Sequence, residues 1–457
     1  MNKLKNIETS RELALEVLTK VDKEKAYSNI QLNQSLQNAN LSRLDINLAT
    51  EIIYGTIQRL NTIDWVIQKY LKNDIKELEL WVKNLLRLSV YQIIYLDRIP
   101  SHAIVNEAVE IAKKNGHKGI ASMVNGVLRN IIRTETKIKI PEILKDYEKI
   151  TIEHSHPEWI VKKFINEYGL CETEEICREN NKAPFNSIRV NTLKITREKM
   201  IGLLKNELGD DTVITPSSLS KEGIRIKGSG NLATLSLYEE GFYSIQDESS
   251  MLAVDALDPK PYMTVLDATA APGGKTTHIA EKMQNKGRII ASDIHRHKIK
   301  LIEEQKKRLG IDIIETVCID ARDLHKEYGA IFDCILLDVP CSGLGVIRRK
   351  PELKWTKSID DITKLIKVQQ NILENVSSLL KPGGILVYST CTMTKEENQD
   401  MIYRFIKKYP EFKLDKLLST LLSESINQKI DTSEGMLQIL PHYFHTDGFF
   451  ISRMVKL

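Results

Sequence analysis

The sequence has few cysteines, and none of them stands in a metal-binding pattern. Its six cysteines lie among 457 residues without a Cys-x-x-Cys pair, and the ten histidines form no ligand spacing beside them. Neither a disulfide framework nor a zinc site is predicted, and no metal is expected. No uninterrupted apolar run approaches the roughly 18 residues of a membrane span. The start MNKLKNIETS is polar and lacks the apolar core of a signal peptide. We therefore expect no membrane association and a cytoplasmic location.

The composition excludes a disordered or fibrous chain. Hydrophobic residues make up 42% of the sequence and charged residues 28%, which is typical of a soluble globular protein. The net charge of +4 is unevenly spread, because residues 1–140 hold 21 Lys and Arg against 15 Asp and Glu. A basic amino-terminal part is compatible with a polyanionic partner, although an excess of this size is common on ordinary surfaces.

The length and patterning predict three domains joined by a linker. Apolar residues recur at helical spacing through the first part, beginning after a capping-box pattern at Thr9–Glu12, and predict an all-helical domain. A Lys/Glu-rich stretch follows, and then a mixed region with the short β-like runs SIRVNTLK and GIRIK. The predicted boundaries are 1–135 for the helical domain, 136–155 for the linker, 156–238 for a small α+β subdomain and 239–457 for the last domain.

The last domain alternates short β runs with helical segments. The runs are TVLDAT, GRIIASD, IIETVCID, FDCILLD, GILVYST and GFFISRMVK. Strands separated by helices predict a mostly parallel, doubly wound sheet whose ligands bind beyond the carboxyl ends of the strands. The polar motifs of this domain all fall at such strand ends, which points to one site there.

The motif LDATAAPGGKTTHIA predicts a strand, a glycine-containing turn and a helix beginning near Lys275. Backbone amides and the helix start then face the ligand, and the glycine pair allows close approach. Asp293 ends the next strand and Asp320 the third, where a carboxylate can bind ribose hydroxyls. This pattern predicts a nucleoside-containing cofactor. A phosphate-binding P-loop is the competing interpretation, but its pattern needs glycine where Thr269 stands, and Pro272 lacks a backbone donor.

Two cysteines fall at adjacent strand ends. Asp338 and Cys341 follow the fourth predicted strand in LLDVPCSGLGVIRRK, and Cys391 follows the fifth in VYSTCT. A single cysteine is by default a buried, inert residue, but two at one rim beside a nucleoside site favour a catalytic pair. The basic run 348–350 is expected to lie beside them and to contact phosphates. Cys171, Cys177, Cys318 and Cys334 lack this placement and are interpreted as structural.

On these motifs the chain resembles the RNA 5-methylcytosine methyltransferases of the NOL1/NOP2/Sun type, and among them the bacterial members that act on small-subunit (16S) ribosomal RNA. The specific elements are AAPGGKT at 270–276, DVPCSGLG at 338–345 and STCT at 389–392, supported by RVN at 189–191 and QDESS at 246–250. Thr269 departs from the cysteine usual there, which we expect to matter little because that position mainly offers backbone. The resemblance implies a Rossmann-like class I methyltransferase domain with a mostly parallel seven-stranded sheet, preceded by a NusB-like helical RNA-binding domain.

The resemblance also implies a cofactor, a partner and roles for the site residues. The cofactor is S-adenosyl-L-methionine, the partner is small-subunit ribosomal RNA, and the chain is expected to act as a monomer. Carried over from the family, Cys391 is the nucleophile that attacks carbon 6 of cytosine, because carbon 5 is otherwise too weakly nucleophilic to take a methyl group. Cys341 assists product release, Asp338 binds the nitrogen edge of the pyrimidine and the methyl-donor region, and Lys275 orients the nucleophile or holds substrate. The expected cofactor-binding residues are Thr269, Ala270, Ala271, Pro272, Gly273, Gly274, Lys275, Asp293, Asp320 and Asp338.

Three other functions compete with this interpretation. Adenine or guanine amino-group methyltransferases end their fourth strand in Asn/Asp-Pro-Pro-aromatic, where this chain has Asp-Val-Pro-Cys. DNA cytosine methyltransferases use a Pro-Cys thiol but lack the second cysteine and the helical domain. A noncatalytic RNA-binding antitermination or ribosome-assembly factor would suit the first domain alone, and binding of S-adenosylmethionine would discriminate against it.

Overall fold

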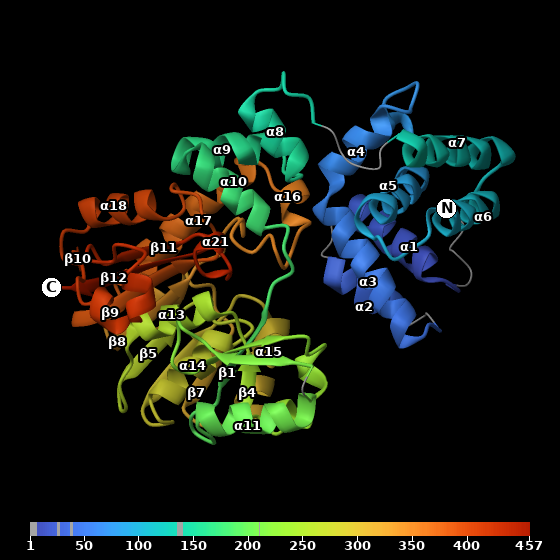
Figure 1. Ribbon diagram of the computed structural model, residues 1–457. Helices are drawn as coiled ribbons and strands as arrows, with labels where there is room; N and C mark the ends of the chain where they lie inside the picture. Colours follow the sequence, from blue (N-terminus) through green and yellow to red (C-terminus); the bar gives the residue numbers. More distant parts are fainter. Residues whose placement is uncertain (1–6, 25–27, 37–39, 135–139, 210) are drawn as a thin grey trace. The chain divides into compact units, whose positions relative to one another are not determined.

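The computed structural model describes residues 7–24, 28–36, 40–134, 140–209 and 211–457. The chain forms two compact units (Figure 1). One comprises the residues up to Lys182 together with Arg349–Thr356, and the other comprises Ala183–Arg348 and Lys357–Leu457. We call them the helical unit and the catalytic unit. Among the described residues, no helix has both the length and the apolarity needed to cross a membrane.

The helical unit is built from helices alone in its described part. The residues expected at the core from their spacing, such as Leu13, Val17, Ile52 and Ile53, are all buried in one apolar core. The all-helical prediction for the first domain is confirmed. The helices are α1 (Ser10–Glu24), α2 (Ser28–Leu36), α3 (Arg43–Gln58), α4 (Leu60–Gln68), η1 (Ile75–Glu77), α5 (Leu80–Tyr95), α6 (Ser101–Asn115), α7 (Lys118–Thr134), α8 (Asp146–Glu153), α9 (Glu158–Tyr168), α10 (Leu170–Glu179) and α16 (Leu353–Thr356).

Helix α8 (Asp146–Glu153) lies inside the stretch 136–155 that the sequence predicts as a linker. The first residues of that stretch, up to 139, lie outside the described residues. The pattern did not indicate α8 because Ile150 is its one residue classed as buried, so no apolar stripe marks the helix.

The segment Arg349–Thr356 groups with the helical unit although it follows the Pro-Cys motif in sequence. Buried Glu352 accepts hydrogen bonds from the backbone amide and hydroxyl of Ser28. Buried Lys354 donates to the carbonyl oxygens of Gln58 and Ser155, each at 2.8 Å. These bonds fix the segment among α2, α3 and the residues after α8.

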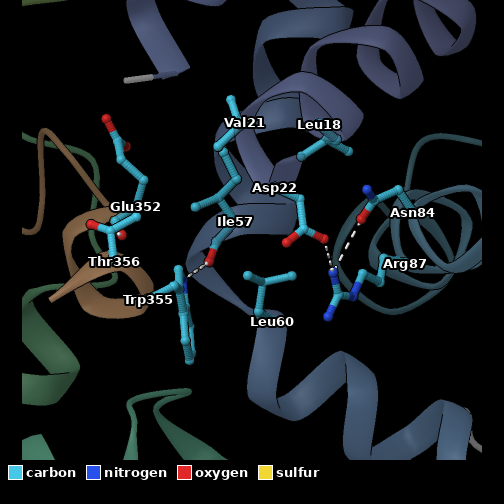
Figure 2. A pocket seen from close by; sticks show the side chains of 10 residues that line it. All are labelled: Leu18, Val21, Asp22, Ile57, Leu60, Asn84, Arg87, Glu352, Trp355 and Thr356. Atoms are coloured by element: carbon cyan, nitrogen blue, oxygen red, sulfur yellow. Dashed lines mark hydrogen bonds and ion pairs between the residues drawn. The ribbon is translucent and has the colours of Figure 1, made fainter. Parts of the chain in front are cut away.

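A cavity of about 90 Å³ lies within the helical unit beside this segment (Figure 2). Much of its polar wall is paired, because Arg87 donates to Asn84 and Asp22 and forms a two-point ion pair with Asp64, whereas Asn84 Nδ2 has no partner among the described residues. Trp355 donates its indole N–H to the carbonyl of Ile57. The remaining lining is mostly apolar, so we interpret the cavity as a packing defect beside the segment.

The catalytic unit begins with a small antiparallel sheet in the order β2-β3-β1-β4. The runs SIRVNTLK and GIRIK contribute β1 and β3, as predicted, while β4 begins beyond the predicted boundary at 238. The elements are β1 (Asn186–Val190), α11 (Arg197–Leu208), β2 (Val213–Pro216), β3 (Gly223–Lys227), η2 (Leu232–Thr234), α12 (Ser236–Glu239) and β4 (Tyr243–Ile245).

A mostly parallel sheet forms the centre of the catalytic unit, in the order β10-β12-β9-β8-β5-β6-β7 with β11 paired to β12. The five strands from β9 to β7 are parallel, and β10, β11 and β12 pair antiparallel. The predicted Rossmann-like class is confirmed, with β11 as an eighth strand. The strands are β5 (Thr264–Asp267), β6 (Arg288–Ser292), β7 (Ile314–Val317), β8 (Phe332–Asp338), β9 (Leu380–Thr390), β10 (Phe412–Leu414), β11 (Met436–Ile439) and β12 (Phe449–Lys456).

Two apolar cores cover this sheet. One contains residues of α13, α14 and α15, and the other contains residues of α17 and α18. The helices leave the carboxyl ends of the parallel strands accessible to the loops that carry the motifs. The helical elements are α13 (Glu248–Leu257), α14 (Gly274–Lys282), α15 (Arg296–Leu309), η3 (Leu324–Lys326), α17 (Ile359–Ser377), α18 (Gln399–Lys408), α19 (Leu418–Leu421), α20 (Glu424–Asn427) and α21 (Pro441–Phe444).

Candidate active site

The expected cofactor residues 269–275 form the turn between β5 and the start of α14. Gly273 caps the helix with φ 103°, and a side chain there would meet Ile302 Cα at 3.2 Å, so both backbone and packing require glycine. A side chain at Gly274 would meet no protein atom within 4 Å. The protein's own packing therefore does not demand Gly274, and its small size keeps the space above the turn open to a bound group.

Asp267, at the end of β5, is a buried carboxyl group with one unused oxygen. Its Oδ2 accepts from the Thr276 hydroxyl at 2.7 Å, while Oδ1 has no hydrogen-bond partner. Burial raises the pKa of Asp267 to about 6, and the hydrogen bond from Thr276 opposes that shift. An unsatisfied acceptor beside the open turn fits a ligand that brings hydrogen-bond donors.

Asp293 and Asp320 lie where the sequence places them, after β6 and β7 at the same edge of the sheet. Asp293 Oδ1 accepts from the backbone amide of His295 at 2.9 Å, which fixes the carboxylate. Hydrogen bonds from Arg322 lower the pKa of Asp320, so this group stays ionised. Two fixed carboxylates after β6 and β7 can accept hydrogen bonds from the hydroxyl groups of a nucleoside, and the residues present fit such a cofactor.

Asp338, at the end of β8, joins three loops. Its Oδ2 accepts from the Lys275 ammonium at 2.6 Å, and its Oδ1 accepts from the Ser389 hydroxyl at 2.8 Å. Its backbone oxygen accepts from the Thr269 hydroxyl at 2.8 Å, so Thr269 contributes its side chain as well as its backbone. Burial would lower the pKa of Lys275, but the charge and hydrogen bond of Asp338 outweigh it and raise that pKa.

The two thiols lie in contact. Strands β8 and β9 are parallel neighbours with Asp338 opposite Ser389, so Cys341 and Cys391 follow at the same edge. Their sulfur atoms are 3.3 Å apart. The hydrogen bond to Cys391 raises the pKa of Cys341 well above its ordinary value, and burial adds to the shift. This environment favours Cys341 as a neutral thiol that donates its proton toward Cys391.

Backbone contacts hold the thiol loops together. Gly345 donates its amide to the carbonyl of Cys391 at 3.0 Å, and Gly448 donates to Gly345 at 2.8 Å. A side chain on Gly345 would lie 2.0 Å from the Gly448 oxygen, so the DVPCSGLG motif needs glycine here.

The four other cysteines lie away from this contact. Cys177 and Cys334 are buried, and burial raises the pKa of each to about 12. Cys171 and Cys318 are exposed rather than buried.

The expectation that residues 348–350 form a run of phosphate-binding cations at the thiols is wrong for Arg348. Its side chain is buried, and it donates to the carbonyl oxygens of Ala183 and Thr446. Arg349 and Lys350 belong to the helical unit. The sequence shows three consecutive basic residues, but it does not show that the Arg348 guanidinium is used to bind backbone carbonyl oxygens.

Three residues that the structure ties to the site have no role in the sequence-based prediction. Ser389 holds Asp338, and buried Glu397 hydrogen-bonds to the thiol loops. Buried Arg189 forms a two-point ion pair with Glu281 of α14 and donates to the carbonyl of Gly274 at 2.8 Å. Ser389 and Arg189 belong to the quoted motifs STCT and RVN, and Glu397 lies five residues after STCT. Only the tertiary contacts reveal what each residue does.

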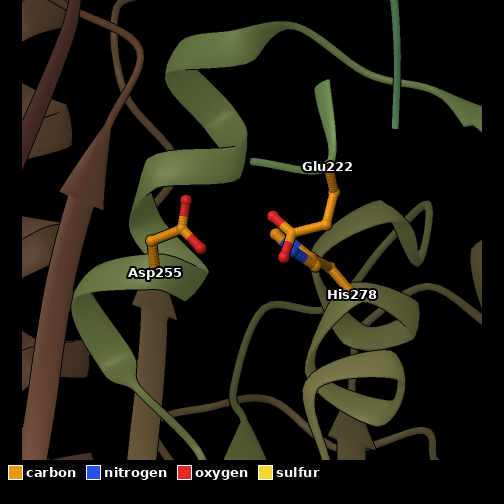
Figure 3. A group of neighbouring side chains, drawn as sticks. All are labelled: Glu222, Asp255 and His278. Carbon is orange, nitrogen blue, oxygen red and sulfur yellow. The ribbon is translucent and has the colours of Figure 1, made fainter. Parts of the chain in front are cut away.

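One group among the described residues could ligate a metal ion: Glu222, Asp255 and His278 (Figure 3). The Lys282 ammonium lies 2.7 Å from a carboxylate oxygen of both Glu222 and Asp255. The chain therefore supplies the positive charge that these carboxylates need, and we assign no metal to the group.

Three family models match the chain. The model described as "16S rRNA methyltransferase RsmB/F" matches residues 254–455. A NusB family model covers residues 8–133, and a ferredoxin-like domain of RsmF/B-like methyltransferases covers residues 156–233. The last match extends over α9 and α10, which the contacts assign to the helical unit.

Similar proteins span nearly the whole chain. A Bacillus subtilis (strain 168) protein named "Probable ribosomal RNA small subunit methyltransferase B" is 45% identical over 447 residues, 98% of each chain. The solved structure "Crystal Structure of PH0851" has 30% identity and a TM-score of 0.81, covering 99% of this chain and 100% of that one. The structure of NSun6 from Pyrococcus horikoshii with SFG has 27% identity and a TM-score of 0.58, covering 66% of this chain and 98% of that one.

Proposed function

Because the chain belongs to the 16S rRNA methyltransferase RsmB/F family, we propose that it methylates carbon 5 of a cytosine in small-subunit ribosomal RNA. The family and the full-length relatives support an S-adenosylmethionine-dependent ribosomal RNA methyltransferase. The choice of carbon 5 and the covalent route are our proposal, argued from the two thiols.

The residues around the β5–α14 turn would hold S-adenosylmethionine. The open space at Gly274, the free Oδ1 of Asp267 and the anchored carboxylates of Asp293 and Asp320 suit its nucleoside part. When bound, the cofactor supplies a methyl group made electrophilic by a sulfonium. The chain's task is then to make carbon 5 of the base nucleophilic.

Cys391 is the proposed nucleophile. A thiolate that adds to carbon 6 turns the ring into an enamine-like species, which can take a methyl group at carbon 5. The Lys275 ammonium lies close enough to Cys391 for a thiolate there to raise the pKa of the lysine. By the same attraction, the positive charge of Lys275 stabilises the thiolate.

Cys341 is the proposed aid to product release. Once carbon 5 carries the methyl group, its proton must leave and the bond from carbon 6 to sulfur must break. Cys341 is 3.3 Å from the departing sulfur and is kept as a thiol while Cys391 is the anion. As the bond from carbon 6 to Cys391 breaks, Cys341 can pass its proton to the departing sulfur and, as the resulting thiolate, take the proton from carbon 5, so that both cysteines end as thiols.

Asp338 is proposed to orient the base. Lys275 and Ser389 fix its two oxygens, so the carboxylate has one orientation at the strand end between the cofactor turn and the thiols. A fixed carboxylate there can accept a hydrogen bond from the amino group of cytosine and so orient the ring.

The helical unit and the small sheet are proposed to bind the RNA. The NusB family match and the basic excess of residues 1–140 support this role.

The observation that carries the proposal is the contact between the thiols of Cys341 and Cys391 at the cofactor edge of the sheet. The test is to incubate purified protein with a small-subunit ribosomal RNA transcript and S-adenosylmethionine carrying a labelled methyl group, then analyse the nucleosides by mass spectrometry. Label in 5-methylcytidine is expected. Label in another nucleoside would refute the carbon-5 assignment, and no label with protein that binds RNA would favour the noncatalytic assembly factor.

A further inference from the structure

Glu397 is a fully buried carboxylate between β9 and α18 that accepts four hydrogen bonds. Its Oε1 accepts from the backbone amide of Ser342 and the side-chain amide of Gln369, each at 2.9 Å. Its Oε2 accepts from the hydroxyls of Ser342 and Thr394, each at 2.6 Å. Every acceptor position is directed at a neutral donor, and among the described residues no ion pair within 4.0 Å is found for this carboxylate.

The donors come from three separate segments. Ser342 immediately follows Cys341, and Thr394 lies three residues after Cys391. Gln369 belongs to α17 and also donates to the carbonyl of Pro340 at 2.9 Å. One carboxylate therefore joins both thiol loops and the helix beside them.

A direct bond between the loops completes the arrangement. The hydroxyls of Ser342 and Thr392 are 2.7 Å apart. Since the Ser342 hydroxyl donates its hydrogen bond to Glu397, the Thr392 hydroxyl must be the donor to Ser342. The residues next to each thiol are thus hydrogen-bonded to each other and oriented by the same acid.

Burying a carboxylate without a basic partner is costly, and here four charge-assisted hydrogen bonds offset the cost. A neutral side chain could fill the space, but it could not accept four hydrogen bonds. The carboxylate is needed because all four donor groups converge on it, and Ser342 and Thr394 belong to the loops that hold the two thiols.

We propose that Glu397 is a positioning residue that holds Cys341 and Cys391 in contact, so that release follows attack at the same carbon 6. This inference rests on the proposed function, because it assumes that the two thiols act in turn on one base. Glu397 is fully buried and would act through the thiol loops rather than on the base. Its negative charge also helps to keep Cys341 protonated, consistent with the raised pKa of that thiol.

The test compares Glu397→Gln with Glu396→Gln, a neighbouring charge-matched control whose side chain is only partly buried. The amide nitrogen of glutamine cannot accept from the two donors that face one oxygen, so the loops must shift. The first measurement needs no RNA: diamide oxidises two adjoining thiols to a disulfide, and mass spectrometry follows the peptide joining Cys341 to Cys391. We expect this disulfide to form in wild type and Glu396→Gln and to form at least about tenfold more slowly in Glu397→Gln.

The second measurement separates positioning from loss of structure. If the thiols move apart, Glu397→Gln should bind S-adenosylmethionine with unchanged affinity, lose about 100-fold in turnover and accumulate a covalent protein–RNA complex. Thr394→Val, which removes one donor of the four, should give smaller changes in the same direction and serves if Glu397→Gln does not fold. Disulfide formation and turnover at wild-type levels in both variants would overturn the proposal, as would a loss of turnover matched by an equal loss of cofactor affinity. If wild type forms the disulfide but does not methylate carbon 5, the proposed function fails while the positioning role stands.

Discussion

The Lys275 ammonium donates to Asp338 Oδ2 at 2.6 Å, joining the first turn of α14 to the end of β8. The pair links the cofactor turn to the Pro-Cys loop across the parallel sheet. Since Ser389 holds the other oxygen of Asp338, the lysine is fixed beside Cys391 as well. One cation therefore pairs with the Asp338 carboxylate and interacts electrostatically with Cys391.

Replacing Lys275 with methionine is expected to lower turnover by about 100-fold, a larger loss than that in affinity for S-adenosylmethionine. The reason is the loss of the positive charge that stabilises the Cys391 thiolate, and the rise of turnover with pH should therefore move to higher pH. The measurement is a pH profile of kcat beside calorimetry with the cofactor. A profile unchanged in position would show that Lys275 does not act on the nucleophile.

Asp293→Ala is expected to weaken S-adenosylmethionine binding at least about tenfold without loss of folding. The carboxylate is fixed at the end of β6 where a nucleoside hydroxyl would be accepted, and each such charged hydrogen bond is worth about 1.5–3 kcal/mol. Calorimetry measures the affinity, and the exposed Asp312→Ala is the control. Equal affinities in the two variants would remove Asp293 from the cofactor site.

Much of the site could be predicted because parallel strands bring their carboxyl ends to one edge. The positions of Asp293, Asp338, Cys341 and Cys391 followed from where hydrophobic runs stop, without any knowledge of tertiary contacts. The same logic cannot identify Glu397, since its four donors become neighbours only through the register of β8 and β9 and the packing of α17.

Some elements were missed because they are short and bury little. β10 has three residues and β11 four, too few for an alternating pattern to emerge, and they are stabilised by pairing with β12. The grouping of Arg349–Thr356 with the helical unit is likewise invisible in sequence, because Lys354 is buried against backbone carbonyls rather than an acid.

Asp267→Asn is expected to stabilise the protein at neutral pH but not in acid. The folded-state pKa of Asp267 is raised to about 6 from an ordinary 3.8, so between these values the folded state binds the extra proton. The free energy of unfolding of wild type therefore falls as pH rises through this window, and the loss persists above pH 6. The asparagine side chain does not titrate, so its advantage should grow from near zero at about pH 3, below both pKa values, to about 1–3 kcal/mol at pH 7.5.

Urea denaturation at several pH values measures this difference, with the exposed Asp400→Asn as the control. A constant difference between Asp267→Asn and wild type across the pH range would contradict a raised pKa. The gain in stability should come with weaker cofactor binding, since a ligand donor can no longer reach an ionised carboxylate.

Binding of small-subunit ribosomal RNA is expected to weaken steeply with salt. Replacing the exposed Lys118, Arg129 and Arg133 of α7 with serine should flatten the plot of log affinity against log salt by about 0.7–0.9 for each lost phosphate contact. Filter binding of the full chain measures the slope. The matched control replaces Lys407, Lys413 and Lys416, three exposed lysines of the catalytic unit, and an equal change there would argue against a specific role for α7.

The two thiols are expected to fail at different steps. If Cys391 forms the bond to carbon 6, Cys391→Ala removes the route to an activated ring, and both methylation and any covalent protein–RNA complex should vanish. If Cys341 serves elimination, Cys341→Ala should still attack and methylate but should not release the product. That variant would accumulate a covalent complex, seen as a slowly migrating band on a denaturing gel.

The step at which each variant fails, rather than the position of its sulfur, distinguishes the two thiols, because the sulfurs lie only 3.3 Å apart. The exposed Cys318→Ala is the control and should behave as wild type. Accumulation of the complex in Cys391→Ala instead would make the Pro-Cys thiol the nucleophile. Normal turnover in both variants would mean that neither thiol is catalytic, and their contact would then be ordinary packing at the end of two neighbouring strands.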